Sequence, residues 1–212
     1  MTAIDASYLE AAMTFDAYMA LIEKLLKKDR TTGANQTADM IHYTRMNVVR
    51  MERLMKTVRL TEELKNILGR QVHSITCLTI TEAWCGDAAQ SIPVWERAAR
   101  ESYFINHKLI LRDEHPQLID AFLTNGGRSI PKVIMLDGNS REVLATWGPR
   151  PEEAQIISNE GRRKLKSITG EEERSQAYYE LLTSLQKWYA RDKTKSIQQE
   201  IWELLREVQS RD

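Results

Sequence analysis

The chain has 212 residues with 30 basic and 30 acidic side chains, so its formal net charge at pH 7 is zero. This balance gives no electrostatic argument for nucleic acid or an anionic membrane surface, and neither partner is expected. The basic run "GRRKLK" at residues 161–166 has acids on both sides. It is interpreted as a solvated helix face rather than a phosphate site.

Cysteine and histidine usage excludes several kinds of site. The two cysteines, Cys77 and Cys85, are too few for a disulfide scaffold or a Cys-rich zinc site. The four histidines are scattered without metal-ligand spacing, so neither a metal nor another cofactor is expected. The N-terminus has early acidic residues and no basic start, which is typical neither of a secretory signal nor of a membrane span. These features indicate a reducing cytoplasm.

The first part of the chain, residues 1–71, is predicted to be a helical segment. Apolar residues recur at approximately helical spacing over residues 6–28 and again over residues 38–58. A turn with Gly and Asn separates these two helices. Thr61 is a candidate N-cap of a third, shorter helix that Gly69 closes.

Residues 72–168 have a different pattern, in which short apolar runs alternate with helical segments. The runs are rich in β-branched residues and bounded by turn residues, which favours strands. The expected elements, in chain order, are a strand at 73–81, a helix at 87–102, a strand at 107–113, a helix at 116–123 and a hairpin at 132–148. This order predicts an α/β architecture, a mixed sheet with helices on both faces.

The chain is expected to be helical again after Pro151. Leucines and tryptophans there are interpreted as core residues, and the run "SIQQEIWELLREVQ" has apolar residues close to helical spacing. Residues 169–212 are therefore predicted to be a C-terminal helical extension packed on the same unit.

The stretch "LTITEAWCGDAAQSIPVWERAA", residues 78–99, places Cys85 where a predicted strand ends and a helix begins. A helix N-terminus presents unpaired amides and the positive end of the dipole, which favour a thiolate. We therefore expect Cys85 to be exposed, and more acidic and reactive than an ordinary cysteine. Gly86 allows a tight turn that leaves the sulfur open, and Trp84 shields one side.

The stretch "EAWCGDAA", the strand before it, the later "RSIPK" and Gly148 after the hairpin resemble the thioredoxin superfamily over roughly residues 72–160. More closely, the chain resembles bacterial thioredoxin-like proteins with a helical N-terminal segment and a "WCGD" loop. "RMERLMKTVRLTEEL" and "LRDEHPQLIDAFLTNGGRSIPK" fit that group. The resemblance implies a three-layer α/β/α sandwich with a mixed four-stranded central sheet and helical extensions at both ends.

The resemblance also implies roles for individual residues. Cys85 matches the attacking, catalytic cysteine, and Pro131 matches the cis-proline that faces it. Ile130 matches the residue whose backbone pairs with a bound peptide or glutathione. A trans proline at a strand start is the alternative for Pro131. The active-site loop also contains Trp84, Gly86, Asp87 and Ala88.

Three positions depart from the family pattern. Ala88 stands where the resolving cysteine is expected, so a mixed disulfide on Cys85 cannot be released from within the motif. Thr79 stands where thioredoxins bury an acid, and Asp87 adds a negative charge that works against the thiolate. Cys77 lies too far along the strand to be the resolving thiol and is interpreted as a buried apolar residue. Dithiol reduction is therefore not expected.

Two functions follow from this pattern. The first is a monothiol protein of redox homeostasis, in which Cys85 forms mixed disulfides with a protein or a low-molecular-weight thiol. The second is a catalytically inactive binding or scaffold protein that uses its helical extensions, including to form a homodimer. A peroxide sensor ranks last because no peroxide-pocket pattern accompanies Cys85. The chain lacks the length and order of a typical glutathione transferase.

Overall fold

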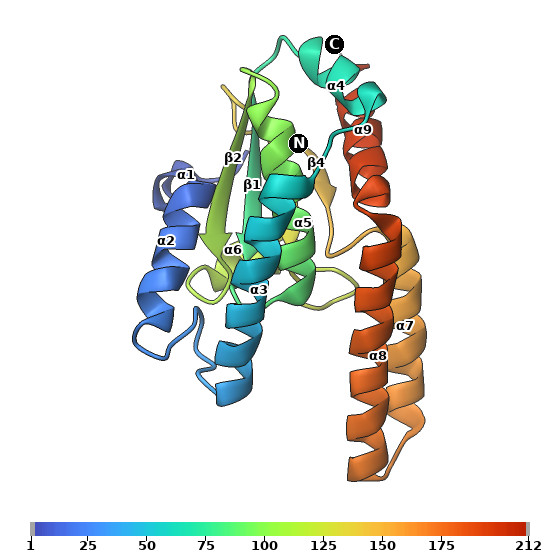
Figure 1. Cartoon of the computed structure of the whole chain (residues 1–212). Coiled ribbons are helices and arrows are strands. Elements are labelled where there is room, and N and C mark those ends of the chain that lie inside the picture. Colours follow the sequence, from blue (N-terminus) through green and yellow to red (C-terminus); the bar gives the residue numbers. More distant parts are fainter. Residues whose placement is uncertain (1–2, 211–212) are drawn as a thin grey trace.

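A four-stranded mixed sheet lies at the centre of the computed structural model, which describes residues 3–210 (Figure 1). Its strand order is β2-β1-β3-β4, with β1 parallel to β2 and antiparallel to β3, and with β3 antiparallel to β4. The elements are α1 (Ala6–Ala11), α2 (Phe15–Leu26), α3 (Ala38–Thr57), α4 (Glu62–Gly69), β1 (Ile75–Thr81), α5 (Gly86–Arg100), β2 (Ile105–Leu111), α6 (Pro116–Asp120), β3 (Lys132–Asp137), β4 (Val143–Trp147), α7 (Glu152–Ser167), α8 (Glu171–Asp192) and α9 (Lys195–Gln209).

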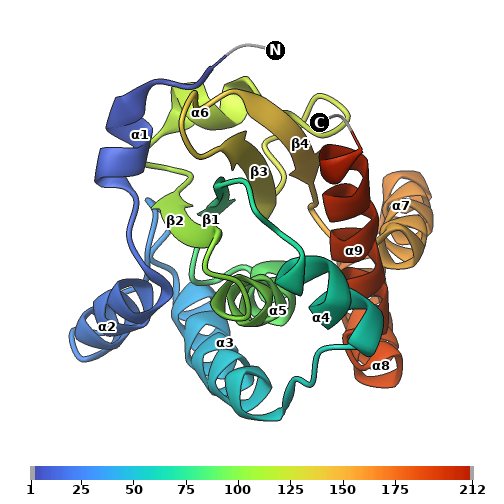
Figure 2. The same ribbon diagram turned by 90° about the horizontal axis from the view of Figure 1, so that it is seen from above.

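Helices cover both faces of the sheet. Figure 2 shows α1 and α6 on one side of the strands, and α3, α4, α5 and α9 on the other. The alternation of side chains along β1 divides the core, because Cys77 packs with Trp95 and Ile201 whereas Leu78 packs with Ile119. The predicted three-layer α/β/α fold with helical extensions is confirmed.

The single helix predicted over residues 6–28 is wrong, because α1 and α2 are separate helices. Between them, the backbone of Met13 pairs with Leu109 of β2 through two hydrogen bonds of 2.8 Å. Thr14 then caps α2 by accepting a hydrogen bond of 3.2 Å from the Ala17 amide. The interruption covers part of the open edge of β2, a contact that helical periodicity does not reveal.

The C-terminal helices leave the sheet and return to it. In Figure 1, α7 and α8 form an antiparallel hairpin that extends beyond the strands, and α9 runs back beside α4. The Gln198 side chain accepts a hydrogen bond of 2.8 Å from the Thr61 amide and donates one of 3.2 Å to the Arg59 carbonyl. The two terminal segments are thus joined to each other. No helix within residues 3–210 is long and apolar enough to cross a membrane.

Ile201 of α9 tests whether the C-terminal segment unfolds with the sheet. Its side chain is 1% exposed within the core that contains Trp95. Replacing Ile201 with Val is expected to lower the free energy of unfolding by about 1 kcal/mol, because a buried methylene is lost. Urea denaturation monitored by tryptophan fluorescence measures this change as a shift of one cooperative transition.

The matched control for Ile201→Val is Ile156→Val on α7, where the side chain is 51% exposed. This change is expected to stay within about 0.5 kcal/mol of wild type. Two separate unfolding transitions, with only the smaller one moved by Ile201→Val, would mean that the C-terminal segment is an independent unit.

Candidate active site around Cys85

Cys85 is the N-cap of α5 and faces the loop that precedes β3. Its thiol donates a hydrogen bond of 3.3 Å to the carbonyl oxygen of Ile130. The Ile130–Pro131 peptide bond is cis. The structure therefore brings Cys85 together with Ile130 and Pro131, which lie more than forty residues further along the chain. Ala88, at the position of a resolving cysteine, is buried in the first turn of α5.

The thiol of Cys85 is buried, with 8% of the residue exposed. Burial raises its pKa to about 12, and the negative charge of Asp87 acts in the same direction. The amide of Ala88 and the guanidinium of Arg150 favour the thiolate but do not outweigh these two effects. The expectation of an exposed, acidic thiol is therefore wrong, because the benefit of the helix N-terminus is smaller than the cost of desolvation.

The cover over the N-terminus of α5 comes from the C-terminal helices. The Asp87 carboxylate forms an ion pair with Arg150 and accepts a hydrogen bond of 2.9 Å from the Tyr189 hydroxyl of α8. One turn further along α5, the Gln90 side chain donates a hydrogen bond of 3.0 Å to that of Gln186. These contacts hold α8 against the beginning of α5. Arg150, Gln186 and Tyr189 carry no motif that marks them in the sequence.

The N-terminal segment also contacts the active-site loop, through hydrogen bonds to the backbone of Ala83. The amide of Ala83 donates a hydrogen bond of 2.8 Å to the Thr32 hydroxyl, and its carbonyl accepts one of 2.9 Å from the Asn47 side chain. Glu82 is fully buried and accepts a hydrogen bond of 2.9 Å from the Asp113 amide. Burial raises the pKa of Glu82. Trp84 is half-buried, with the Arg112 guanidinium 4.9 Å from its ring centroid.

A buried chain of polar groups joins β1, β2 and α5. The Thr79 hydroxyl lies 2.9 Å from Nε2 of His107, and Nδ1 of His107 lies 2.9 Å from a carboxylate oxygen of Glu96. The other oxygen of Glu96 accepts a hydrogen bond of 2.6 Å from Arg100. Burial acts to raise the pKa of Glu96, but its bonds to His107 and Arg100 lower it overall. Thr79 is thus linked through His107 to a buried acid of α5, a pairing that the sequence did not single out.

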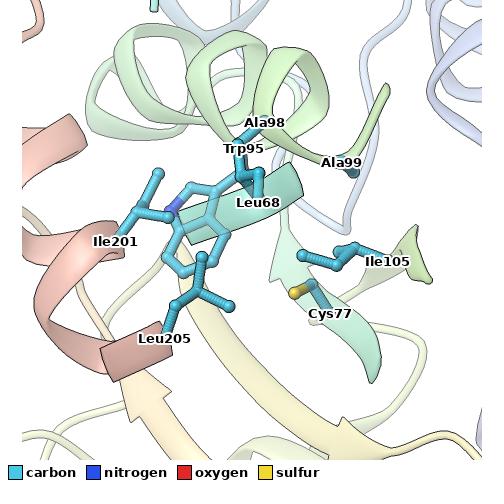
Figure 3. A pocket seen from close by; sticks show the side chains of 8 residues that line it. All are labelled: Leu68, Cys77, Trp95, Ala98, Ala99, Ile105, Ile201 and Leu205. Atoms are coloured by element: carbon cyan, nitrogen blue, oxygen red, sulfur yellow. The ribbon is translucent and has the colours of Figure 1, made fainter. Parts of the chain in front are cut away.

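Cys77 lies on the opposite side of the strand from Leu78, among apolar side chains of α5 and α9 (Figure 3). It is 2% exposed, and burial raises its pKa to about 12. The cavity beside it measures about 10 Å³, close to the lower limit for one water molecule. Cys77 therefore packs as a small apolar residue. Within residues 3–210, no group of three or more His, Cys, Asp or Glu side chains is placed to hold a metal ion.

Comparison with known proteins agrees with this geometry. The sequence model of a family described as Thioredoxin matches residues 33–164, more than half of the chain. The chain belongs to the thioredoxin family. The matched segment of this thioredoxin-family protein includes Cys85, Pro131 and the sheet, and it ends within α7.

Two solved structures share the fold of this thioredoxin-family protein. A protein of unknown function from Pseudomonas aeruginosa is 16% identical with a TM-score of 0.62, and the match covers 97% of this chain and 98% of that one. An HIV epitope-scaffold is 17% identical with a TM-score of 0.59, and the match covers 96% and 98%. At these identities the likeness shows the fold alone. No curated protein matches the chain.

In this thioredoxin-family protein, the negative charge of Asp87 adds to the effect of burial on the pKa of Cys85. Replacing Asp87 with Asn is expected to lower the pKa of Cys85 and to speed its alkylation at pH 9 on the order of tenfold, because a nearby negative charge is removed. Mass spectrometry of samples quenched at successive times gives the rate of Cys85 alkylation. The control is Asp16→Asn, which removes an exposed carboxylate from the first turn of α2. Equal rates in both variants would show that Asp87 does not act on the thiol.

Proposed function

We propose that the protein is a monothiol member of the thioredoxin family that acts through Cys85 by forming mixed disulfides. The observation that carries this proposal is the placement of the Cys85 sulfur 3.3 Å from the Ile130 carbonyl, directly before Pro131. A substrate strand that paired with the backbone of Ile130 would bring its own sulfur to Cys85. The resemblance to bacterial proteins with a "WCGD" loop supports the same function, and a reducing cytoplasm is the compartment in which it would operate.

The proposed exchange has two balanced steps. The Cys85 thiolate attacks one sulfur of a disulfide, so that a new disulfide bond forms at Cys85 and the other half leaves as a thiolate, which takes up a proton from solvent. Ala88 supplies no second thiol. An outside low-molecular-weight thiol therefore attacks the Cys85 disulfide, restores the Cys85 thiol and carries the first half away.

The cover over Cys85 determines when this reaction occurs. Because Cys85 is 8% exposed, a substrate must displace part of the packing around it to reach the sulfur. The protein is therefore expected to react slowly with small alkylating agents and faster with a disulfide that binds beside Pro131. Such selectivity would let the thiol react with its own disulfide substrate rather than with most other electrophiles and disulfides.

The test of this proposal uses the Cys77→Ser variant, which leaves Cys85 as the sole thiol, beside the Cys85→Ser variant. After incubation with glutathione disulfide, mass spectrometry is expected to show one glutathione adduct on Cys77→Ser and none on Cys85→Ser. Added glutathione should then release the adduct. The absence of an adduct on Cys77→Ser in native buffer, with a normal adduct after unfolding in urea, would overturn the proposal.

The burial of Cys85 favours a second candidate, a binding protein without catalysis. In that case exposed helical residues would carry the function, and Tyr178 and Tyr179 of α8 are 47% and 56% exposed. Replacing both tyrosines with Ala would remove the cellular role, while Cys85→Ser would leave it unchanged. The opposite pattern supports the monothiol function. Sedimentation of the same variants tests the predicted homodimer through the helical extensions.

A further inference from the structure

A hollow of about 460 Å³ lies between the loop before Pro131 and one face of α7. This volume is within the usual range for small-molecule sites. We call it the anion hollow, and its lining residues are Thr124, Asn125, Gly127 and Ser129 of the loop, Arg150, and Gln155, Asn159, Arg162, Arg163 and Lys166 of α7. The lining contains four cations and no acid.

The basic side chains of the run "GRRKLK" point to different sides of α7. Arg162, Arg163 and Lys166 face the anion hollow, whereas Lys164 forms an ion pair of 3.4 Å with Glu180 of α8. Within residues 3–210, no hydrogen bond or ion pair involves the side chains of the three residues in the hollow. The acids that flank the run lie on α7 and at the start of α8, and none of them lines the hollow.

Arg150 connects the anion hollow to Cys85. Its side chain is 8% exposed, and its two terminal nitrogens bind Asp87, Gln155 and Ser158. The remaining Nε is buried and has no hydrogen-bond partner within residues 3–210. A buried guanidinium N–H without an acceptor costs free energy.

The loop that forms the other wall of the hollow is also linked to the Cys85 thiol. Ser129 lines the hollow and directly precedes Ile130, whose carbonyl oxygen accepts the hydrogen bond of the Cys85 thiol. Two lining residues are thus linked to the thiol through one neighbour each, Arg150 through Asp87 and Ser129 through Ile130.

We propose that the anion hollow binds the anionic groups of a low-molecular-weight disulfide that exchanges with Cys85. This inference rests on the proposed monothiol function and names its substrate class. Arginine binds carboxylate and phosphate groups through paired, charge-assisted hydrogen bonds, and the neighbouring Asn and Gln side chains donate further ones. In the reaction, the sulfur–sulfur bond of the ligand breaks, a bond to Cys85 forms, and the second thiol leaves with a proton.

Binding is tested by isothermal titration calorimetry on the Cys85→Ser variant, which cannot react. The probes are glutathione disulfide, which carries carboxylates, coenzyme A disulfide, which carries phosphates, and the neutral 2-hydroxyethyl disulfide. At least one anionic disulfide is expected to bind at least about tenfold more tightly than the neutral one, with affinity falling as salt rises. The two anionic probes distinguish carboxylate from phosphate recognition.

Two variants made in the Cys85→Ser background locate the binding. Arg162→Gln combined with Arg163→Gln is expected to weaken binding at least about tenfold, because two charge-assisted contacts are lost. Lys164→Gln, a charge change on the same helix outside the hollow, is expected to change affinity less than about twofold. Equal effects of both changes, or equal binding of the neutral and anionic disulfides, would overturn the proposal.

The experiments distinguish an error in the proposed binding site from an error in the proposed monothiol function. Tight, charge-dependent binding to Cys85→Ser without any adduct on the protein that retains Cys85 supports the hollow and overturns the monothiol function. An adduct that forms at the same rate with neutral and anionic disulfides, and that Arg162→Gln with Arg163→Gln does not slow, supports the function and overturns the hollow.

Discussion

Cys85 is expected to react with iodoacetamide at pH 7.5 about a thousandfold more slowly than an ordinary cysteine. Its pKa is raised from 9.0 to about 12, a difference of three units, and each unit reduces the thiolate fraction tenfold. The rate should therefore continue to rise about tenfold per pH unit well above the pH at which a free thiol levels off. A series of alkylation rates between pH 7 and pH 11, followed by mass spectrometry, measures this profile.

The unfolded chain provides the reference for this profile. In urea, Cys85 and Cys77 should both react as ordinary cysteines, with rates that level off above pH 9. In the folded protein both thiols should be protected, since burial raises the pKa of Cys77 to about 12 as well. Cys85 should remain the faster of the two because it is 8% rather than 2% exposed. A rate that is already constant near pH 7 would show that Cys85 is a thiolate in the folded protein.

Replacing Gly148 with Ala is expected to destabilise the protein by at least about 3 kcal/mol. Gly148 follows β4 with φ at +108°, a backbone conformation that L-residues with a side chain rarely adopt. A Cβ at this position would also overlap the carbonyl oxygen of Pro131, which is backbone and cannot rotate away. Urea denaturation measures the loss, and Gly148→Ala should also alter the contact between Ile130 and Cys85.

Gly69→Ala is the matched control for Gly148. Gly69 is the last residue of α4, and a Cβ there would have no heavy atom within 4 Å. Alanine is therefore expected to be neutral or to stabilise the protein by up to about 1 kcal/mol, because it lowers the conformational entropy of the unfolded chain. An unfolding midpoint for Gly148→Ala that matches wild type would mean that the Pro131 loop can move to accept a side chain.

The order of helices and strands was predictable because each element carries its own local pattern. The β-branched run that became β1 and the capped helix after Thr61 are read from neighbouring residues alone. The break between α1 and α2 was not predictable, because Met13 leaves the helix to pair with a strand almost one hundred residues later. Edge pairing of this kind depends on tertiary structure.

The candidate site likewise has features that the local sequence predicts and features that depend on tertiary structure. The position of Cys85 at a helix N-terminus follows from a local pattern of strand, glycine and helix. Its burial does not, because Cys85 packs in a core with residues far from it in the chain, such as Tyr18 of α2 and Ile130. The local pattern favoured an acidic thiol, and the distant cover reversed that result. His107 was missed for a similar reason, since its two partners lie on β1 and α5.

Helix α8 contacts the first two turns of α5 through Gln186 and Tyr189. The segment shared with the thioredoxin family ends at residue 164, whereas Gln186 and Tyr189 lie after it. Substitutions in α8 can therefore change how often Cys85 meets a reagent while the "WCGD" loop stays identical. Two proteins with the same active-site loop need not react alike, and comparing their C-terminal helices would be the more informative guide to which disulfides each one accepts.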